Sequence, residues 1–499
     1  MKTTFLRTCA MSILLTHVAF SQQLPGSLDT SFGNAGIVTI NLGRFQPLGG
    51  PSRCITLQDD GRIVVAAAYH RNFSNYVKAF YRFNADGSPD NTFAKNGRKI
   101  FYNDSLRSEV MSPGKVVIQG DGKILSGGDF YTGRYKTGGF IITRLLSDGS
   151  VDKPFGNKGE IIVRNETTTG YFADLDLQRS GEIVVANRDA ENNFVRRFKP
   201  NGSLDSSFGT DGLFIVDGTY NFLTDIAVQR DNKILLLIDD ETKGATDRDF
   251  KIVRLLRDGR IDLSFGTNGT VVIDFDNYSQ DTPTSIAVLP NGRILVAGII
   301  WTNVIEGQIG VVRLRNNGVI DPSFATNGKG MYSRTEFSGP EIDLSPNGKF
   351  YLTGEQMERV NSDGSRDLSY GTGGVTMDGQ ACFTAAVQKD NKLLALIWAL
   401  PQLRRYTADS PIAAQNAVVN ESVISKSTTF TCYPNPAKDV LHIQVKVATA
   451  ITLSDQSGSV IMVKNIQDKA DLNVAQLPAG VYYLKNNISG EVKKILIAK

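Results

Sequence analysis

Aromatic, basic and imidazole side chains gather in a few short segments where they could recognise a sugar or a protein. They stand at Tyr69, His70 and Arg71, at Tyr131, Arg134 and Tyr135, and at Trp301. Aromatic rings stack on the flat faces of sugars, and Tyr, Trp and Arg carry much of the contact energy of protein interfaces. These residue types favour a binding surface for a glycan or a protein. The alternative is a solvated loop face with incidental aromatic residues.

Histidine is too scarce to suggest catalysis. The chain has three His, and two of them, His17 and His442, lie in segments that we expect to be removed. A Ser-His-Asp arrangement would therefore need His70, which fits a surface histidine better than a catalytic base. We expect no catalytic residue. The alternative is a glycan-acting hydrolase or lyase that uses acidic, Tyr and Arg side chains.

Three carboxylates close together in the chain raise the question of a metal ion. Asp274, Asp276 and Asp281 lie in one short acidic segment, and carboxylates are ligands that calcium prefers. The segment lacks the D-x-D-x-D-G order of a calcium loop. We therefore expect no resident cofactor, with calcium at these three residues as the alternative.

Two motifs alternate along residues 24–406 and must position these side chains. The first is D-x-x-[FY], with a Gly four residues after the aromatic residue. Its copies are Asp29/Phe32, Asp90/Phe93, Asp152/Phe155, Asp205/Phe208, Asp262/Phe265, Asp321/Phe324 and Asp367/Tyr370. The second motif reads Q-D-D-G-R-I-V-V at 58–65, and looser copies begin at Gln119, Gln178, Gln229, Leu289, Ser345 and Gln388. Such internal repetition is typical of a ring or solenoid of identical units.

Each unit contains four short β-branched segments separated by Asp-Gly or Asn-Gly turns, which predicts four antiparallel strands. Seven such units predict an all-β, seven-bladed β-propeller with four-stranded blades. We name the strands of a blade A to D, innermost first. The last unit lacks its D strand, so we expect the strand near 36–40 to complete that blade and close the ring.

The repeated residues have structural explanations. Asp-Gly forms the A–B turn, the Asp of D-x-x-[FY] caps backbone N–H groups in the C–D turn, and the aromatic residue packs between blades. Ala94 and Ala325 stand where other units have Gly, which predicts irregular turns there. The D–A and B–C connections share the other face, the loop face, where the aromatic and basic segments fall.

The charge balance limits the class of partner, and the cysteine positions limit the possible disulfides. The chain has 54 Lys and Arg against 51 Asp and Glu, which argues against a nucleic acid partner. Cys54 and Cys382 precede or begin A strands of adjoining blades and could pair, but buried free thiols are the favoured interpretation.

Both ends of the chain carry processing or targeting signals. Residues 1–21 combine Lys2 and Arg7, a short apolar stretch and small residues at 19 and 21, which predicts a signal peptide cleaved between Ser21 and Gln22. No later stretch is long and apolar enough for a transmembrane helix. We expect the propeller over 22–407, a small polar linker over 408–429, and an immunoglobulin-like β-sandwich over 430–499.

The repeats resemble the delta-60 repeat family, whose units share both motifs and an intervening R-L; the resemblance implies a β-propeller and no particular chemistry. Residues 431–499 resemble the type IX secretion sorting domain of Bacteroidota. The resemblance is carried by Tyr433-Pro434-Asn435-Pro436, by Gly480 and Tyr482 within L-x-x-G-V-Y-Y, and by a basic apolar tail.

These observations lead to one expected function and two alternatives. The second resemblance implies passage through the outer membrane by the type IX machinery, removal of 430–499 by its sortase, and release or attachment at the cell surface. We expect an exported, non-catalytic scaffold that binds a glycan or a protein. The alternatives are the glycan-acting enzyme, for which a hydrolase needs two carboxylates about 5–9.5 Å apart near the axis, and a passive structural or adhesive protein.

Overall fold

The computed structural model of the chain describes most of the two parts that the sequence predicts. The described residues are 23–40, 53–72, 75–101, 110–132, 137–165, 171–189, 192–216, 221–242, 244, 247–275, 280–301, 307–335, 339–397, 400–409, 430–445, 449–454, 460–486 and 492–498. All their regular elements are strands. The chain divides into two compact units, Met1–Ala414 and Gln415–Lys499. The predicted cleavage position between Ser21 and Gln22 lies outside the described residues.

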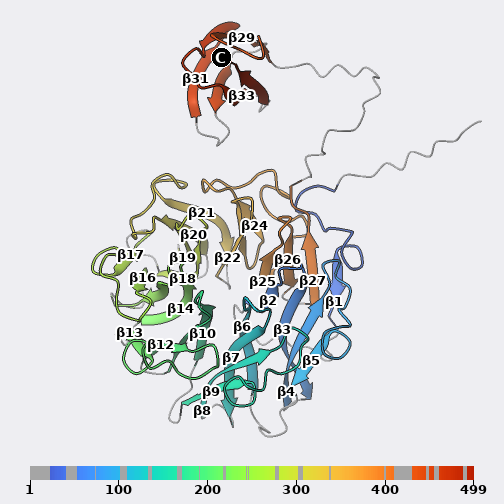
Figure 1. Cartoon of the computed structure of the whole chain (residues 1–499), viewed down its shortest axis with the longest axis vertical. Coiled ribbons are helices and arrows are strands. Elements are labelled where there is room, and N and C mark those ends of the chain that lie inside the picture. Colours follow the sequence, from blue (N-terminus) through green and yellow to red (C-terminus); the bar gives the residue numbers. More distant parts are fainter. Residues whose placement is uncertain are drawn as a thin grey trace, which may run out of the picture. The chain divides into compact units, whose positions relative to one another are not determined.

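The first unit is propeller-like and built from small antiparallel sheets. The sheets follow one another around a ring, from blue through green to orange in Figure 1. We number them by their strands: sheet 1 (β2–β5), sheet 2 (β6–β9), sheet 3 (β10–β13), sheet 4 (β14–β17), sheet 5 (β18–β21), sheet 6 (β22–β24) and sheet 7 (β25–β27 with β1). Sheet 6 has three strands and the others have four.

The strand bounds follow the repeat motifs. In sheets 1 to 3 they are β2 Ile55–Leu57, β3 Ile63–Asn72, β4 Asn75–Phe83, β5 Arg98–Phe101, β6 Val110–Ile118, β7 Ile124–Thr132, β8 Thr137–Leu145, β9 Glu160–Asn165, β10 Tyr171–Leu177, β11 Ile183–Arg188, β12 Asn193–Phe198 and β13 Leu213–Val216. In sheets 4 to 7 they are β14 Asn221–Val228, β15 Ile234–Asp240, β16 Asp249–Leu255, β17 Thr270–Ile273, β18 Gln280–Val288, β19 Ile294–Trp301, β20 Gly307–Leu314, β21 Lys329–Thr335, β22 Glu341–Leu344, β23 Phe350–Thr353, β24 Glu358–Val360, β25 Cys382–Val387, β26 Leu393–Ile397, β27 Gln402–Tyr406 and β1 Ile37–Thr39.

The N-terminal strand closes the last sheet, as the sequence predicts. β1 pairs antiparallel with β27, with Ile37 opposite Arg404 and Thr39 opposite Gln402. Sheet 7 therefore joins residues from both ends of the unit, and its outer strand comes from the N-terminal side. Cys54 and Cys382 are both buried, and the two do not form a disulfide with each other in this arrangement.

The aromatic residue of each D-x-x-[FY] motif is fully buried, which confirms its predicted packing role. Phe32, Phe93, Phe155, Phe208, Phe265, Phe324 and Tyr370 all have 0% exposed surface. Burying a side chain of this size contributes about 1.5–3 kcal/mol. The Asp capping is also confirmed in six of the seven motifs; in sheet 4, for example, Asp262 Oδ1 accepts the N–H of Ser264.

The Asp residues of all seven motifs have a further role that the sequence did not predict. An Arg near the end of the third strand donates its Nε–H to the carboxylate, and its guanidinium lies over the buried aromatic ring. The Arg–Asp–aromatic triplets are Arg405–Asp29–Phe32, Arg82–Asp90–Phe93, Arg144–Asp152–Phe155, Arg197–Asp205–Phe208, Arg254–Asp262–Phe265, Arg313–Asp321–Phe324 and Arg359–Asp367–Tyr370.

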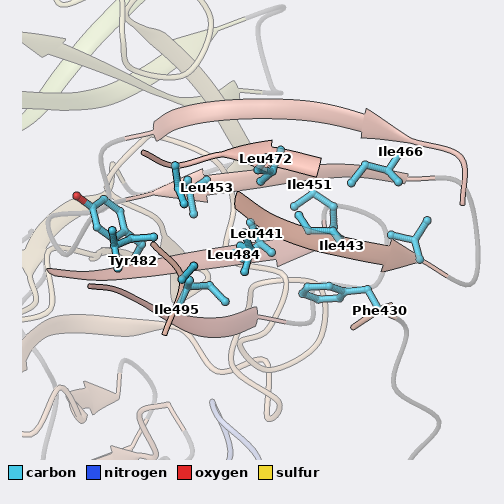
Figure 2. Close-up of a cluster of buried hydrophobic side chains, with 14 residues drawn as sticks. Phe430, Leu441, Ile443, Ile451, Leu453, Ile466, Leu472, Tyr482, Leu484 and Ile495 are labelled. Carbon is cyan, nitrogen blue, oxygen red and sulfur yellow. The ribbon is translucent and has the colours of Figure 1, made fainter. Parts of the chain in front are cut away.

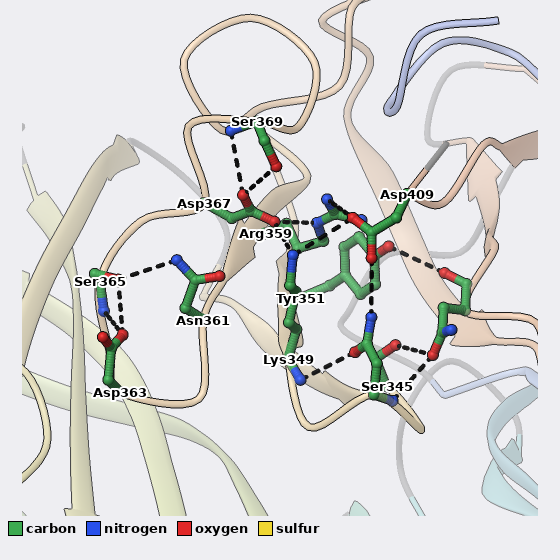
Figure 3. Close-up of polar contacts among 12 residues, drawn as sticks. Ser345, Lys349, Tyr351, Arg359, Asn361, Asp363, Ser365, Asp367, Ser369 and Asp409 are labelled. Carbon is green, nitrogen blue, oxygen red and sulfur yellow. Dashed lines mark hydrogen bonds and ion pairs between the residues drawn. The ribbon is translucent and has the colours of Figure 1, made fainter. Parts of the chain in front are cut away.

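The triplets also connect neighbouring sheets. In six of them the Arg Nη1–H donates to a main-chain carbonyl in the turn that follows the third strand of the next sheet; Arg405, for example, donates to Ala85 O at 2.6 Å. Arg359 differs because its neighbour is sheet 7, where the chain leaves the ring. There the carboxylate of Asp409 accepts from Arg359 Nη2 at 2.6 Å, as Figure 3 shows. Asp409 also accepts from Asn347 and Lys349.

Two turns correct the sequence expectation of irregularity. Ala94 and Ala325 adopt φ of 45° and 44°, close to the 52–54° of the Gly residues at that position in sheets 3 and 4, such as Gly209. The turns therefore keep their shape, because a methyl group is accommodated by a change of a few degrees. An L-residue in this left-handed region costs about 1–2 kcal/mol, against about 0.5–1 kcal/mol for the extra chain freedom of Gly.

Ala94→Gly and Ala325→Gly are therefore expected to stabilise the protein by about 0.5–1 kcal/mol each. Urea unfolding followed by circular dichroism measures the change. Gly209→Ala serves as the reciprocal control, because its Cβ would stand 2.0 Å from the carbonyl oxygen of Leu213 and should destabilise the protein. A lower unfolding midpoint in both Ala→Gly variants would contradict the explanation.

The second unit consists of two small antiparallel sheets around one apolar core. The strands are β28 Phe430–Tyr433, β29 Val440–Val445, β30 Thr449–Ser454, β31 Val460–Ile466, β32 Lys469–Asn473, β33 Gly480–Asn486 and β34 Val492–Ile497. Their order is β28-β29-β32 in one sheet and β31-β30-β33-β34 in the other. Figure 2 shows side chains of both sheets meeting in the core, among them Leu441, Leu453 and Leu484.

Candidate functional site

The innermost strands place one set of polar side chains at the axis of the ring. We call this set the axial cluster. It comprises Arg53, Lys115, Asp174, Asp225, Ser285 and Glu341, from sheets 1 to 6 in that order. All of them except Arg53 are at most 9% exposed. In β6, β10, β14 and β18 the pairing register shifts next to this position, and such a bulge re-aims a side chain.

Arg53 spans the axis. It precedes β2 in sheet 1, and its Nη2 donates to Asp225 Oδ2 of sheet 4 at 2.7 Å and to Ser285 Oγ of sheet 5 at 2.6 Å. Its guanidinium also lies 4.0 Å from the Asp174 carboxylate and 3.9 Å from that of Glu341. Arg53 side-chain atoms therefore occupy the axis at this level.

The axial carboxylates are held by hydrogen bonds from neighbouring strands. Asp225 accepts the N–H of Ile226 on one oxygen and the N–H of Ile286, from sheet 5, on the other. Lys115 Nζ stands 2.9 Å from Asp174. A buried charge that is bonded in this way is stable where an isolated one would not be. The carboxylates thus tie adjacent sheets together near the axis.

Burial and the neighbouring charges shift the pKa values of the axial cluster. Burial opposes the charged form of Arg53, but Asp225, Asp174 and Glu341 raise its pKa above the ordinary value. Burial raises the pKa of Glu341 to about 7, against the opposing effect of Arg53. Burial and the neighbouring Asp174 also raise the pKa of Asp225, against the opposing effect of Arg53.

The predicted binding residues lie only partly in loops, which corrects the sequence expectation. Tyr69, His70 and Arg71 lie in β3, and Tyr131 lies in β7; Tyr69 stands opposite Val77 and Tyr131 opposite Gly138. These strands continue past the expected loop start because the residues beyond the repeat motif still pair across a hairpin. The side chains of these four, and all of Arg134 and Tyr135, lie outside what the structure describes.

Among the aromatic residues predicted to bind a ligand on the loop face, Trp301 is the one whose side chain is described. It ends β19, pairs with Gln280 of β18 and Gly307 of β20, and is partly exposed. It therefore stands at the loop end of sheet 5. Neither the structure nor the sequence assigns it a ligand, so its role in binding stays a prediction.

The predicted acidic segment contributes to a carboxylate group that includes a residue the sequence did not suggest. Oxygen atoms of Asp249, Asp274 and Asp281 lie within 4.8 Å of one another. Asp276 lies outside the described residues. Asp281 Oδ2 also accepts the N–H of Phe275, which orders the segment without an ion. Calcium at this position stays a prediction.

In the C-terminal unit the predicted sorting residues serve the fold. Asn435 accepts the N–H of Leu496 and donates to the carbonyl oxygen of Lys494, so the turn that contains Pro434 and Pro436 is tied to β34. Tyr482 is buried and donates to the carbonyl oxygen of Pro478, just before Gly480. Tyr433 is 59% exposed and therefore available to a partner.

Comparisons with known proteins support both parts of this description. Residues 431–498 match the family described as a secretion system C-terminal sorting domain. Segments 58–93, 119–155, 178–208, 229–265 and 289–324 match a domain of unknown function that is described as a beta-propeller, DUF5122. A search of curated proteins found no match. Within the described residues, no helix is long and apolar enough to cross a membrane.

Solved structures resemble the chain only distantly. A protein from Lactobacillus plantarum is 10% identical over 67% of this chain and 89% of its own, with a TM-score of 0.41. A calcium-binding regucalcin from Agrobacterium tumefaciens is 11% identical over 59% of this chain and 88% of its own, with a TM-score of 0.29. Prolyl oligopeptidase B from Galerina marginata is 11% identical over 79% of this chain and 48% of its own, with a TM-score of 0.36.

At these TM-scores the likeness says nothing about ligand or activity. The two family matches and the repeated sheets are specific. The chain therefore carries β-propeller repeats of the delta-60 type and a type IX secretion sorting domain, which directs it to the cell surface or the medium.

Proposed function

We propose that the protein is an exported seven-bladed β-propeller that binds a glycan or a protein on its loop face. The seven sheets of the first unit are taken as its blades, with β1 closing the last one. The second unit, with its two sheets, is taken as an immunoglobulin-like sandwich that the type IX machinery recognises and its sortase removes.

The observation that carries the binding proposal is the bonding of the axial cluster. Asp225 accepts hydrogen bonds from two backbone N–H groups and from Arg53. A general acid or base must exchange a proton with a substrate, and a carboxylate held on both oxygens by main-chain donors is poorly suited to that role. The cluster instead forms a rigid polar floor beneath the variable loop-face connections, which is the usual arrangement of a binding site on a stable scaffold.

Trp301→Ala is expected to weaken binding of the mature chain to its glycan or protein ligand at least tenfold, because an exposed Trp at a binding surface often dominates the contact energy. Glycan arrays and pull-downs with the full mature chain identify the ligand, and biolayer interferometry measures its affinity. Leu263→Ala is the matched control, since Leu263 is an apolar residue, 70% exposed, in the third-to-fourth-strand turn of sheet 4, on the opposite face.

Two results would overturn the proposal: no ligand in broad glycan and protein panels, or an equal loss of affinity in the Leu263 variant. The first result would favour the passive structural or adhesive alternative. Unchanged affinity in the Trp301 variant would show that the ligand does not bind at the loop end of sheet 5.

One observation keeps the glycan-acting enzyme as a second candidate. Asp174, Asp225 and Glu341 gather near the axis, and a glycosidase needs two carboxyl groups there. This candidate predicts release of sugars from a polysaccharide and loss of that activity in Glu341→Gln. Unchanged activity in Glu341→Gln, or no product from any polysaccharide tested, would exclude these carboxylates as the catalytic pair.

A further inference from the structure

The outer edge of sheet 1 carries a basic groove away from the loop face. We call it the rim groove. It has a volume of about 630 Å³ and lies between β5 of sheet 1 and the third-to-fourth-strand turn of sheet 2. Its lining includes Lys95, Arg98 and Lys99 from the first sheet, and Asp148 and Ser150 from the second. A groove of this size is within the usual range for a small-molecule or oligosaccharide site.

The three cations of the rim groove have no carboxylate partner in the described part of the chain. Among the described residues, no Asp or Glu oxygen lies within 4.0 Å of the charged atoms of Lys95, Arg98 or Lys99. Most other cations on the turn side of the ring are paired; Arg62, for example, binds both Asp60 and Asp90. Lys95 and Arg98 are exposed, and their backbones are joined by two hydrogen bonds across the turn. The groove therefore holds an ordered positive charge without a counter-ion from the protein.

The basic residues depart from the repeat. At the position of Lys95 the other units have Asn34, Asn157, Thr210, Thr267, Thr326 and Thr372. At the position of Lys99 they have Val38, Ile161, Phe214, Val271, Gly330 and Thr376. At the position of Arg98 only one other unit is basic, and that residue, Lys329, donates to the carbonyl oxygen of Asp274. The folding requirements of the turn are thus met without these charges, so the charges need another explanation.

The single carboxylate in the lining is occupied within its own turn. Asp148 Oδ1 accepts the N–H and the hydroxyl of Ser150 at 2.8 and 2.6 Å. Those bonds hold the pKa of Asp148 below its ordinary value. The groove therefore presents three cations and one carboxylate, which leaves an excess of two positive charges beside the polar groups of Thr92 and Ser150.

We propose that the rim groove binds an anionic polysaccharide, one that carries carboxylate or sulfate groups along its chain. Lys95 and Arg98 would bind one anionic group, and Lys99, on the opposite side of the strand from Arg98, would bind the next along the polymer. A nucleic acid fits less well because such sites combine a long basic surface with exposed aromatic rings for stacking. Of the two rings beside the groove, Phe93 is fully buried, and Phe101 is covered by Lys99, whose Nζ lies 5.3 Å from its centroid.

The test uses the full mature chain and four probes of matched size: chondroitin sulfate, polygalacturonate, neutral dextran and single-stranded DNA. Binding is measured by biolayer interferometry from 50 to 500 mM NaCl. The triple variant Lys95→Ala, Arg98→Ala, Lys99→Ala is expected to bind the two anionic polysaccharides at least tenfold more weakly. The slope of log K against log[NaCl] should become shallower by about two to three in this variant, as expected when three cation contacts are lost.

The matched control removes three positive charges elsewhere. Arg257→Ala, Arg260→Ala, Lys389→Ala changes side chains that are 58%, 75% and 76% exposed and should leave polysaccharide affinity within about twofold. Circular dichroism melting of both triple variants checks that they fold.

Three outcomes overturn the proposal: no binding of either anionic polysaccharide to the unchanged chain, equal losses in the two triple variants, or DNA binding as tight as polysaccharide binding. The result is independent of the loop-face proposal, because a polysaccharide held at the rim groove is insensitive to Trp301→Ala. Conversely, a loop-face ligand is insensitive to the rim-groove variant.

Discussion

Arg197→Met is expected to destabilise the propeller by about 3–5 kcal/mol, the largest effect among single substitutions in the seven triplets. Arg197 Nε donates to Asp205 at 2.8 Å, and both side chains are at most 10% exposed. Its removal leaves a buried carboxylate without its cation and removes the bond to the next sheet at Arg257 O. A buried pair broken on one side costs far more than an exposed pair does.

We choose Arg197 because its partner, Asp205, has no second cation within 4.0 Å among the residues that the structure describes. In the other six triplets a Lys or Arg just after the first-to-second-strand turn also binds the Asp, as Lys233 binds Asp262 at 2.9 Å. Sheet 3 has Glu182 at this position. Arg254→Met should therefore cost less than Arg197→Met, because Lys233 still neutralises Asp262.

Equilibrium unfolding in urea, followed by circular dichroism at pH 7, measures both changes. Arg260→Met is the control, since Arg260 pairs with Asp258 at 2.8 Å on an exposed surface and should change stability by less than about 1 kcal/mol. If Arg197→Met and Arg254→Met cost the same, Lys233 does not compensate for the loss of Arg254. If either matches Arg260→Met, that buried ion pair does not stabilise the contact between sheets.

The second large effect concerns the axial cluster: Glu341→Gln should make the protein more stable at pH 8 and flatten its stability between pH 5 and 8. Burial raises the pKa of Glu341 to about 7 in the folded protein, above its ordinary 4.5. A raised carboxyl pKa contributes stability below the unfolded value of 4.5, and that contribution is lost as the pH rises through 7. The shift corresponds to about 3 kcal/mol between those limits.

The groups that face Glu341 are Arg53, Lys115 and Asp343. Glutamine keeps the shape of the side chain and removes its titration, so the variant isolates this one group. Urea unfolding at pH 5, 6, 7 and 8 gives the slope of stability against pH. Glu182→Gln is the matched control: although burial opposes it, bonds from Ser180 and Arg257 hold the pKa of Glu182 below its ordinary value, so it does not titrate in this range.

If Glu341→Gln retains the slope of the unchanged protein between pH 5 and 8, Glu341 is already ionised in the folded state. A fall in stability at pH 8 would show that its ion pair with Arg53 outweighs the cost of burying it. Either result would contradict the description of the axial cluster.

Much of the fold could be predicted from the sequence because the same pattern of turns and strands recurs in each unit. The alternation of two turn motifs indicated the strands, the buried aromatic residues and the Asp caps, and the missing last strand indicated that the strand near 36–40 pairs with β27. The Arg of each triplet was missed for a physical reason. Arg254, for instance, is a charged residue on a strand, and only contact between two sheets turns it into a buried partner of Asp262 and Asn316.

The axial cluster was missed because its members differ in type. Its position lies four residues before the first residue of the turn motif, where the units have Lys115, Asp174, Asp225, Ser285, Glu341 and Thr384. Sheet 1 has Cys54 there and contributes Arg53 from one residue earlier. Aligning the units at this position would have revealed a column of polar residues in strands that are otherwise buried. The strands β3 and β7 extend beyond the repeat motif into the aromatic segments, and hairpin pairing there leaves no repeated sequence signal that would predict it.

The pairing of β1 with β27 sets the order in which the ring can form. Ile37 and its partner Arg404 lie far apart in the chain, and until they pair, sheet 7 has no outer strand. Closing a contact that spans most of the unit is slow, since the intervening chain must first be ordered. Every intermediate before that step exposes the edges of two sheets, which are sites of aggregation. The first unit thus depends on its first and last strands meeting, and trimming residues 37–39 should remove the ring-closing step of folding.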